Sequence, residues 1–152
     1  MSIQQMVRKI TPVAAVVSLV AATAASAAVP WQVSGWGTRN EFTFGGQVVI
    51  QPTGDVAGHF TIVIDLPDGT HSACRYLRFY RGSVYRNVAT FYGDGRCYSP
   101  TYGWYTSINQ FTVRDNGSPG AGIDVIDVNF LGATGVAIPG GVLSSGDLAI
   151  TP

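Results

Sequence analysis

The chain contains 152 residues, with nine basic and nine acidic side chains, two histidines and two cysteines. A single domain is the natural expectation for this length. Without Arg8 and Lys9, residues 28–152 keep seven arginines, no lysine and all nine acidic residues. This region is slightly acidic and its arginines are spread singly. Such a chain is not built to neutralise a phosphate backbone, so nucleic acid is not an expected partner.

The first 27 residues have the pattern of a secretory signal peptide. A basic, polar start precedes an apolar run over residues 11–24, which ends in Ala-Ser-Ala at 25–27. The run is shorter than the roughly 20 residues that a membrane-spanning helix needs. We expect cleavage after Ala27, with Ala28 as the alternative. The mature domain, residues 28–152, is then expected in the periplasm, at the cell surface or outside the cell, without a membrane span.

Residues 28–152 are patterned as short strands. Apolar and polar side chains alternate along residues 42–51, 60–66, 110–114 and 126–130, which places one face on a core and the other toward water. Turn-forming residues separate these runs at 52–55, 67–70, 93–95 and 115–120, and Asp68-Gly69 is expected to close a hairpin. The pattern predicts one all-β domain, a small antiparallel sandwich or barrel of about eight strands.

The two cysteines, Cys74 and Cys97, both lie in the region expected to be exported. In an oxidising compartment such a pair is expected to form a disulfide. A metal-binding pair or a catalytic thiol is the alternative, but neither cysteine has histidines at ligand spacing. The sequence therefore predicts one structural disulfide.

An aromatic and basic stretch over residues 75–105 holds all seven tyrosines and five of the arginines. Aromatic rings beside guanidinium groups suit stacking on sugars or on another protein. We expect Tyr98, Tyr102, Trp104 and Tyr105 to lie in a loop and to bind a polysaccharide or another cell-envelope component. Ordinary strand packing is the alternative, because tyrosine favours strands and arginine stems cover apolar surface.

A second unusual segment, residues 115–124, gathers oxygen donors around a glycine-rich loop. Calcium favours such donors, and Asp115, Asn116 and Asp124, with Asp127 as a further candidate, are its expected ligands. The spacing does not match an EF-hand loop, and a structural Asx turn is the alternative. No other cofactor is expected.

The sequence contains no recognised catalytic motif. His59 and His71 lie outside any metal-ligand pattern, and no nucleophile elbow, P-loop or dinucleotide fingerprint is present. A noncatalytic domain is therefore expected. A small secreted hydrolase of the glycosidase type stays open as an alternative, because strands can bring two aspartates to within about 5 to 9 Å of each other.

Residues 111–124 match the pattern F-T-V-x-D-N-G-x-P-G-x-G-x-D, and residues 140–150 are similar to a G-G-x-L-x-x-G ending. These motifs resemble a bacterial secreted domain that follows choice-of-anchor modules. Weaker similarities lie at residues 33–37, 58–60 and 88–93. Members of that family often follow a larger domain, whereas here the domain directly follows the signal peptide. The resemblance implies an extracellular β-domain and assigns no chemistry.

Taken together, these features predict a noncatalytic extracellular β-domain with a binding or structural role at the cell surface or among secreted proteins. A calcium-stabilised adhesive domain and a small hydrolase using aspartates are the alternatives.

Overall fold

The structure is a computed structural model that describes residues 28–40, 42–131 and 138–152, without the side chains of residues 138–140. The predicted signal peptide, residues 1–27, lies outside the described residues. Within the described ranges, no helix is long and apolar enough to span a membrane.

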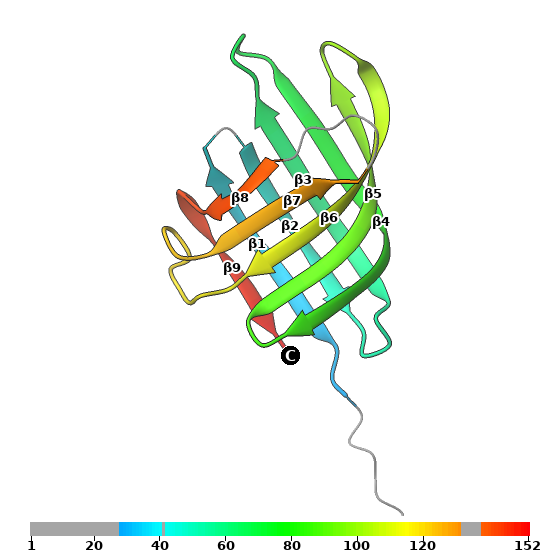
Figure 1. Cartoon of the computed structure of the whole chain (residues 1–152), viewed down its shortest axis with the longest axis vertical. Coiled ribbons are helices and arrows are strands. Elements are labelled where there is room, and N and C mark those ends of the chain that lie inside the picture. The colour runs from blue at the N-terminus through cyan, green and yellow to red at the C-terminus, as the bar shows by residue number, and fades with distance from the viewer. Residues whose placement is uncertain (1–27, 41, 132–137) are drawn as a thin grey trace, which may run out of the picture.

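The described part of the chain forms one antiparallel sheet of nine strands (Figure 1). Strands adjacent in sequence pair with one another as far as β8, and β9 pairs with β1, which gives the order β8-β7-β6-β5-β4-β3-β2-β1-β9. The prediction of an all-β domain is confirmed. The strands are β1 (Trp31–Arg39), β2 (Phe42–Ile50), β3 (Val56–Asp65), β4 (His71–Tyr85), β5 (Val88–Ser99), β6 (Gly103–Arg114), β7 (Val125–Phe130), β8 (Ile138–Val142) and β9 (Ser145–Thr151).

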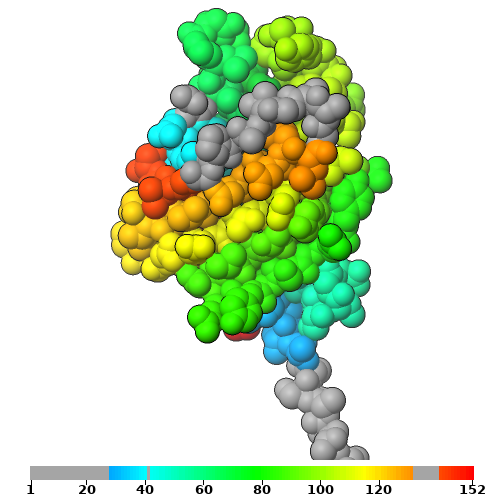
Figure 2. Space-filling view, viewed as in Figure 1, coloured from blue at the N-terminus to red at the C-terminus, as the bar shows by residue number. Residues whose placement is uncertain are grey.

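The sheet curls into a half-barrel whose edge strands are β8 and β9. Only Leu143 and Ser144 separate these two strands in the chain, so both edges meet at one side of the molecule. Gln32 near the start of β1 pairs with Thr151 at the end of β9, so the two ends of the region 28–152 lie together. The β3–β4 and β5–β6 hairpins project at the opposite end (Figure 2).

The core consists of the inward-facing side chains of this curled sheet, and aromatic rings fill its centre. Phe91 and Phe111 stack with ring centroids 5.0 Å apart, and the Phe60 ring meets Phe111 edge-on at 5.1 Å. Each of these three rings is at most 2% exposed. Phe60 and Phe111 lie at apolar positions of the predicted alternating runs, and Phe42, Phe44, Ile126 and Val128 at such positions are buried too, so the predicted core faces are confirmed.

One predicted turn is wrong, because residues 93–95 lie inside β5. Both glycines face the core opposite large rings of β4. A Cβ at Gly95 would lie 2.5 Å from Cε1 of Tyr76, and a Cβ at Gly93 would lie 2.8 Å from Cδ1 of Phe79. The glycines therefore make room for rings rather than for a turn.

Strand β4 carries two irregularities that change which residues face outward. Its pairing with β5 shifts register between Tyr76 and Arg78 and again between Phe79 and Arg81. Each shift adds one residue to β4, the arrangement of a β-bulge. As a result Leu77, the extra residue of the first shift, is 56% exposed, while Tyr76 stays fully buried.

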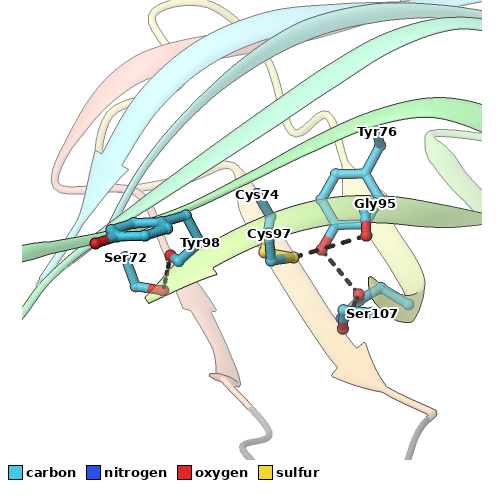
Figure 3. The surroundings of a disulfide bond; sticks show 8 residues. Ser72, Cys74, Tyr76, Gly95, Cys97, Tyr98 and Ser107 are labelled. Atoms are coloured by element: carbon cyan, nitrogen blue, oxygen red, sulfur yellow. Dashed lines mark hydrogen bonds between the residues drawn. A yellow bond between two sulfur atoms is a disulfide. The ribbon is translucent and has the colours of Figure 1, made fainter. Parts of the chain in front are cut away.

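The predicted disulfide between Cys74 and Cys97 is confirmed. The two cysteines are direct partners on β4 and β5, and both side chains are buried. Figure 3 shows the disulfide between Ser72 on one side and Tyr76 with Ser107 on the other. The disulfide indicates an oxidising, extracytoplasmic location.

A buried polar group lies next to the disulfide in the same core. The hydroxyls of Tyr76 and Ser107 both donate to Oδ1 of Asn109 at 2.8 Å. Burial raises the pKa of Tyr76 well above its ordinary value, so its phenol stays a proton donor. This group fixes β4 to β6 across the inner face of β5.

Removing the disulfide is expected to destabilise the domain. In the chain-entropy picture, a bridge over 23 residues of separation contributes roughly 3 kcal/mol to the free energy of unfolding. The double variant C74A/C97A should unfold at lower urea concentration than the oxidised protein by about that amount. A reductant should weaken the native protein and leave the double variant unchanged; equal stability of the two proteins would contradict the prediction.

The predicted hairpin at Asp68-Gly69 is also confirmed, between β3 and β4. The backbone N–H and the hydroxyl of Thr70 donate to Oδ1 of Asp68 at 2.9 and 2.6 Å. These hydrogen bonds lower the pKa of Asp68 below its ordinary value of 3.8. The ionised carboxylate therefore stabilises the turn.

The turn is expected to weaken in acid. Because the folded-state pKa of Asp68 is lowered, its contribution is fully present above pH 3.8 and is lost as the pH falls through the folded-state value. Native protein and the Asp68→Ala variant should differ in urea midpoint at about pH 6 and converge near about pH 2. A difference that stays constant over this range would show that the ionised carboxylate does not stabilise the turn.

Candidate functional site

Two aromatic side chains lie side by side on the outer surface of β5 and β6. Tyr98 and Trp104 are direct partners across these strands, and strand alternation turns both away from the core. Their rings meet edge-on with centroids 5.4 Å apart. Tyr98 is 42% exposed and Trp104 is 64% exposed. We call this pair the aromatic platform.

The platform borders a hollow of about 650 Å³ on the outer surface of β4, β5 and β6. Leu77 reaches this hollow because the first bulge of β4 turns it outward. Charged side chains from β4 and β5 complete the lining. We call this the basic hollow, and its charged residues are Arg75, Arg78, Asp94 and Arg96.

The charges in the basic hollow are unevenly balanced. Arg78 forms an ion pair with Asp94 at 3.6 Å. Asp94 also accepts a hydrogen bond from Tyr80, which raises the pKa of that phenol. Arg96 instead places its guanidinium over the indole of Trp104, 4.6 Å from the ring centroid, and Arg75 is the direct cross-strand partner of Arg96. The hollow therefore holds three arginines and one carboxylate, and only Arg78 is paired with it.

The four aromatic residues selected from the sequence lie in three different places in the structure. Tyr98 and Trp104 form the platform, while Tyr102 lies in the β5–β6 turn and is 82% exposed. Tyr105 is the partner of Cys97 and packs against the core. The prediction that all four lie in a loop is wrong, because β5 extends to Ser99 and β6 begins at Gly103.

The sequence reasoning noted the arginines of residues 75–105 but did not select them as site residues, and it missed Leu77. A signal for them exists in the spacing of the inward residues of β4. Tyr76, Phe79 and Gly82 follow one another at intervals of three rather than two, which marks the bulges that turn extra residues outward.

The loop over residues 115–124 contacts the edge strand β9. Asp124 is fully buried; its Oδ2 accepts the backbone N–H of Leu148 at 2.9 Å and its Oδ1 that of Asn116 at 2.8 Å. Asp115 accepts the N–H of Ile150 through Oδ2 at 3.0 Å and that of Gly117 through Oδ1 at 3.0 Å. Leu148 and Ile150 are alternate residues of β9, so both donors belong to the edge of β9 that faces away from β1.

The expected calcium ligands therefore already accept hydrogen bonds from the backbone. The structure brings Asp115, Asn116 and Asp124 together, whereas Asp127 lies on β7 opposite Thr112. Asp147 lies near the loop instead and accepts the hydroxyl of Ser118 at 2.7 Å. In the described part of the chain, no group of three or more metal-ligating side chains is arranged to hold a metal ion. Calcium binding stays a prediction.

A second hollow, of about 480 Å³, lies at the end of the half-barrel near the β3–β4 and β5–β6 hairpins. Apolar side chains including Ile64, Leu66 and Phe130 line it, together with the hydroxyls of Ser72 and Ser99. Ser72 already donates to the carbonyl of Tyr98 at 2.9 Å. None of the described side chains that line this hollow is charged, so its chemistry differs from that of the basic hollow.

Comparison with known proteins found no matching protein family, no matching curated protein and no matching solved structure. The resemblance to the domain that follows choice-of-anchor modules therefore stays a prediction.

The carboxylate of Asp124 is expected to be essential for stability. In Asp124→Asn, an amide N–H₂ would face one of the two backbone donors, which costs about 2–3 kcal/mol of unfolding free energy. Urea unfolding should show this loss. Asp55→Asn, in the exposed β2–β3 turn, is the control and should change stability little. Equal stability of the two variants would mean that the contact with β9 contributes nothing.

Melting curves of the native protein and of Asp124→Asn also show whether residues 115–124 form a hydrogen-bonded loop or a calcium site. If backbone donors satisfy Asp115 and Asp124, native protein should melt at the same temperature with millimolar calcium and with a chelator. A higher melting temperature in calcium, absent from Asp124→Asn, would establish the cation site instead.

Proposed function

We propose that residues 28–152 form a noncatalytic extracytoplasmic domain that binds a polysaccharide or another cell-envelope component through the aromatic platform. One observation carries the proposal: two large aromatic rings, Tyr98 and Trp104, are in contact with each other and exposed above a hollow. Exposed apolar surface that is gathered in one place marks interaction sites.

The chemistry of the platform supports a sugar ligand. An indole and a phenol present flat apolar faces with a polar tip, which suits the apolar face and hydroxyls of a sugar ring. Leu77, which is 56% exposed, adds apolar surface to the hollow that Trp104 lines. These side chains project from strands rather than from a loop, so the protein loses little conformational entropy when a ligand binds to them.

A calcium-stabilised structural or adhesive domain is the second candidate. Asp147 supports it, because its Oδ1 is buried and has no hydrogen-bond partner among the described residues. A Cβ at Gly120 would overlap Oδ2 of Asp124 and lie 2.8 Å from this oxygen of Asp147, so the two carboxylates approach the same point.

The hydrolase alternative depends on two carboxylates that are free to act on a substrate. Asp115 and Asp124 lie close to each other, but their oxygens accept four backbone N–H groups, two from β9 and two from the loop itself. No observation specifically favours this alternative over binding.

The binding proposal is tested by pull-down with insoluble polysaccharides and isolated cell envelopes. Trp104→Ala should weaken retention at least about tenfold, because truncation of a central tryptophan removes a large part of the binding energy. Its melting temperature should stay near the native value, since Trp104 is mostly exposed.

Trp36→Ala is the matched control. Trp36 is 65% exposed, almost the same as Trp104, but it lies on β1 outside the basic hollow. Retention of this variant should equal that of the native protein. Equal losses in both tryptophan variants would show nonspecific adsorption, and full retention of Trp104→Ala would overturn the proposal.

A further inference from the structure

Arg75 and Arg96 face each other on the outer surface with like charge. They are direct cross-strand partners on β4 and β5, a position in which equal charges destabilise a sheet. Both side chains are exposed. Neither forms an ion pair with any residue that the structure describes, where Arg78–Asp94 is the sole arginine–carboxylate pair.

The strands are held together at this point by the disulfide. Cys74 and Cys97 immediately precede and follow Arg75 and Arg96 in their strands, and they form the neighbouring cross-strand pair on the inner face. The covalent bridge therefore holds the backbones of Arg75 and Arg96 next to each other despite the repulsion between their like charges. The positive charges of Arg75 and Arg96 therefore stay close together on the outer surface.

Asp94, the acidic residue that lines the hollow, forms no ion pair with Arg75 or Arg96. Asp94 is only 15% exposed at its side chain, and it is occupied by Arg78 and by the Tyr80 hydroxyl. Residues 28–152 hold more acidic than basic side chains, yet three of their seven arginines line this one hollow. The positive charge is therefore a local property of the basic hollow.

We propose that the ligand of the platform is an acidic polysaccharide, with sugar carboxylates at Arg75 and Arg96 and a sugar ring against Trp104. This inference rests on the proposed binding function and specifies its substrate class. A guanidinium binds a carboxylate through two parallel hydrogen bonds. Arg96 lies over one face of the Trp104 indole, 4.6 Å from the ring centroid, so the charged donor and the aromatic ring are in contact with each other. Charge and stacking thus act on one sugar unit and its neighbour.

Nucleic acid and anionic lipid surfaces fit the hollow less well. Both present a high density of phosphates and are bound through many basic residues, whereas lysine is absent from residues 28–152. The exposed indole also requires a ligand with an apolar face beside its charge. Uronic acid units combine a ring face with one carboxylate each.

The test compares polygalacturonate with its methyl ester, and alginate with its carboxyl-reduced form, by affinity electrophoresis of the mature domain. Each pair shares its backbone and differs in charge. Native protein should bind at least one acidic form at least about tenfold more tightly than its neutral partner, and this preference should fall as salt rises. The double variant R75Q/R96Q should lose the preference and keep the weaker binding to the neutral form.

The melting temperature of R75Q/R96Q separates a binding role from a structural one. Because the like-charged pair is removed, the variant should melt at the native temperature or above it. A clear drop would mean that the arginines stabilise the fold. Arg114→Gln, an exposed arginine at the end of β6 outside the hollow, is the control and should keep the full preference.

The remaining outcomes distinguish this inference from the proposed function. Equal binding to acidic and neutral forms, abolished by Trp104→Ala, would overturn the acidic ligand and leave the binding function intact. Failure to bind any of the four polymers would overturn the acidic ligand, while retention on neutral insoluble polysaccharide would still support the platform. Binding to vesicles of anionic phospholipid that is as tight as binding to the acidic polymers would show attraction to negative charge in general. That result would also overturn the acidic polysaccharide as the ligand.

Discussion

The fold depends on how the two edges of a curled sheet are joined. β8 and β9 meet at one side of the half-barrel without forming a ladder with each other, so backbone donors along β9 would otherwise lose their partners. Asp115 and Asp124 supply the missing acceptors at Ile150 and Leu148. Two carboxylates nine positions apart thus bind the edge strand in place of a tenth strand. Buried backbone donors must be satisfied, and here side chains do so.

The strands β4, β5 and β6 have two faces with separate chemistry. Inside, the disulfide, the buried hydroxyls and the large rings over Gly93 and Gly95 fix the strands to one another. Outside, the same strands carry the aromatic platform and the basic hollow. Because adjacent residues of a strand face opposite sides, the rigid interior directly determines the spacing of the exterior groups.

Much of the fold followed from alternation, since the inward positions of residues 42–51, 60–66, 110–114 and 126–130 could be assigned from the order of apolar and polar residues. The inward positions Ser107 and Asn109 of β6 could not, because both are polar. The cysteine pair and the Asp68-Gly69 hairpin were equally accessible. Residues 93–95 were misassigned because glycine supplies room for a ring as readily as it supplies a turn, and only the ring positions of Tyr76 and Phe79 distinguish the two. The basic hollow could not be predicted for a similar reason, because the bulges of β4 break the two-residue period on which the assignment of inward and outward residues depends. Tyr105 was grouped with Trp104 although adjacent strand residues face opposite sides.

The two ends of the region 28–152 lie at one end of the half-barrel, where Gln32 pairs with Thr151, and the hairpin that carries Tyr98 and Trp104 projects from the other end (Figure 1). A tether fixed at either end therefore holds the aromatic surface outward, away from the point of attachment. Orientation is built into the topology: any anchored copy, on a bead or on a larger scaffold, would present its exposed indole to the surroundings.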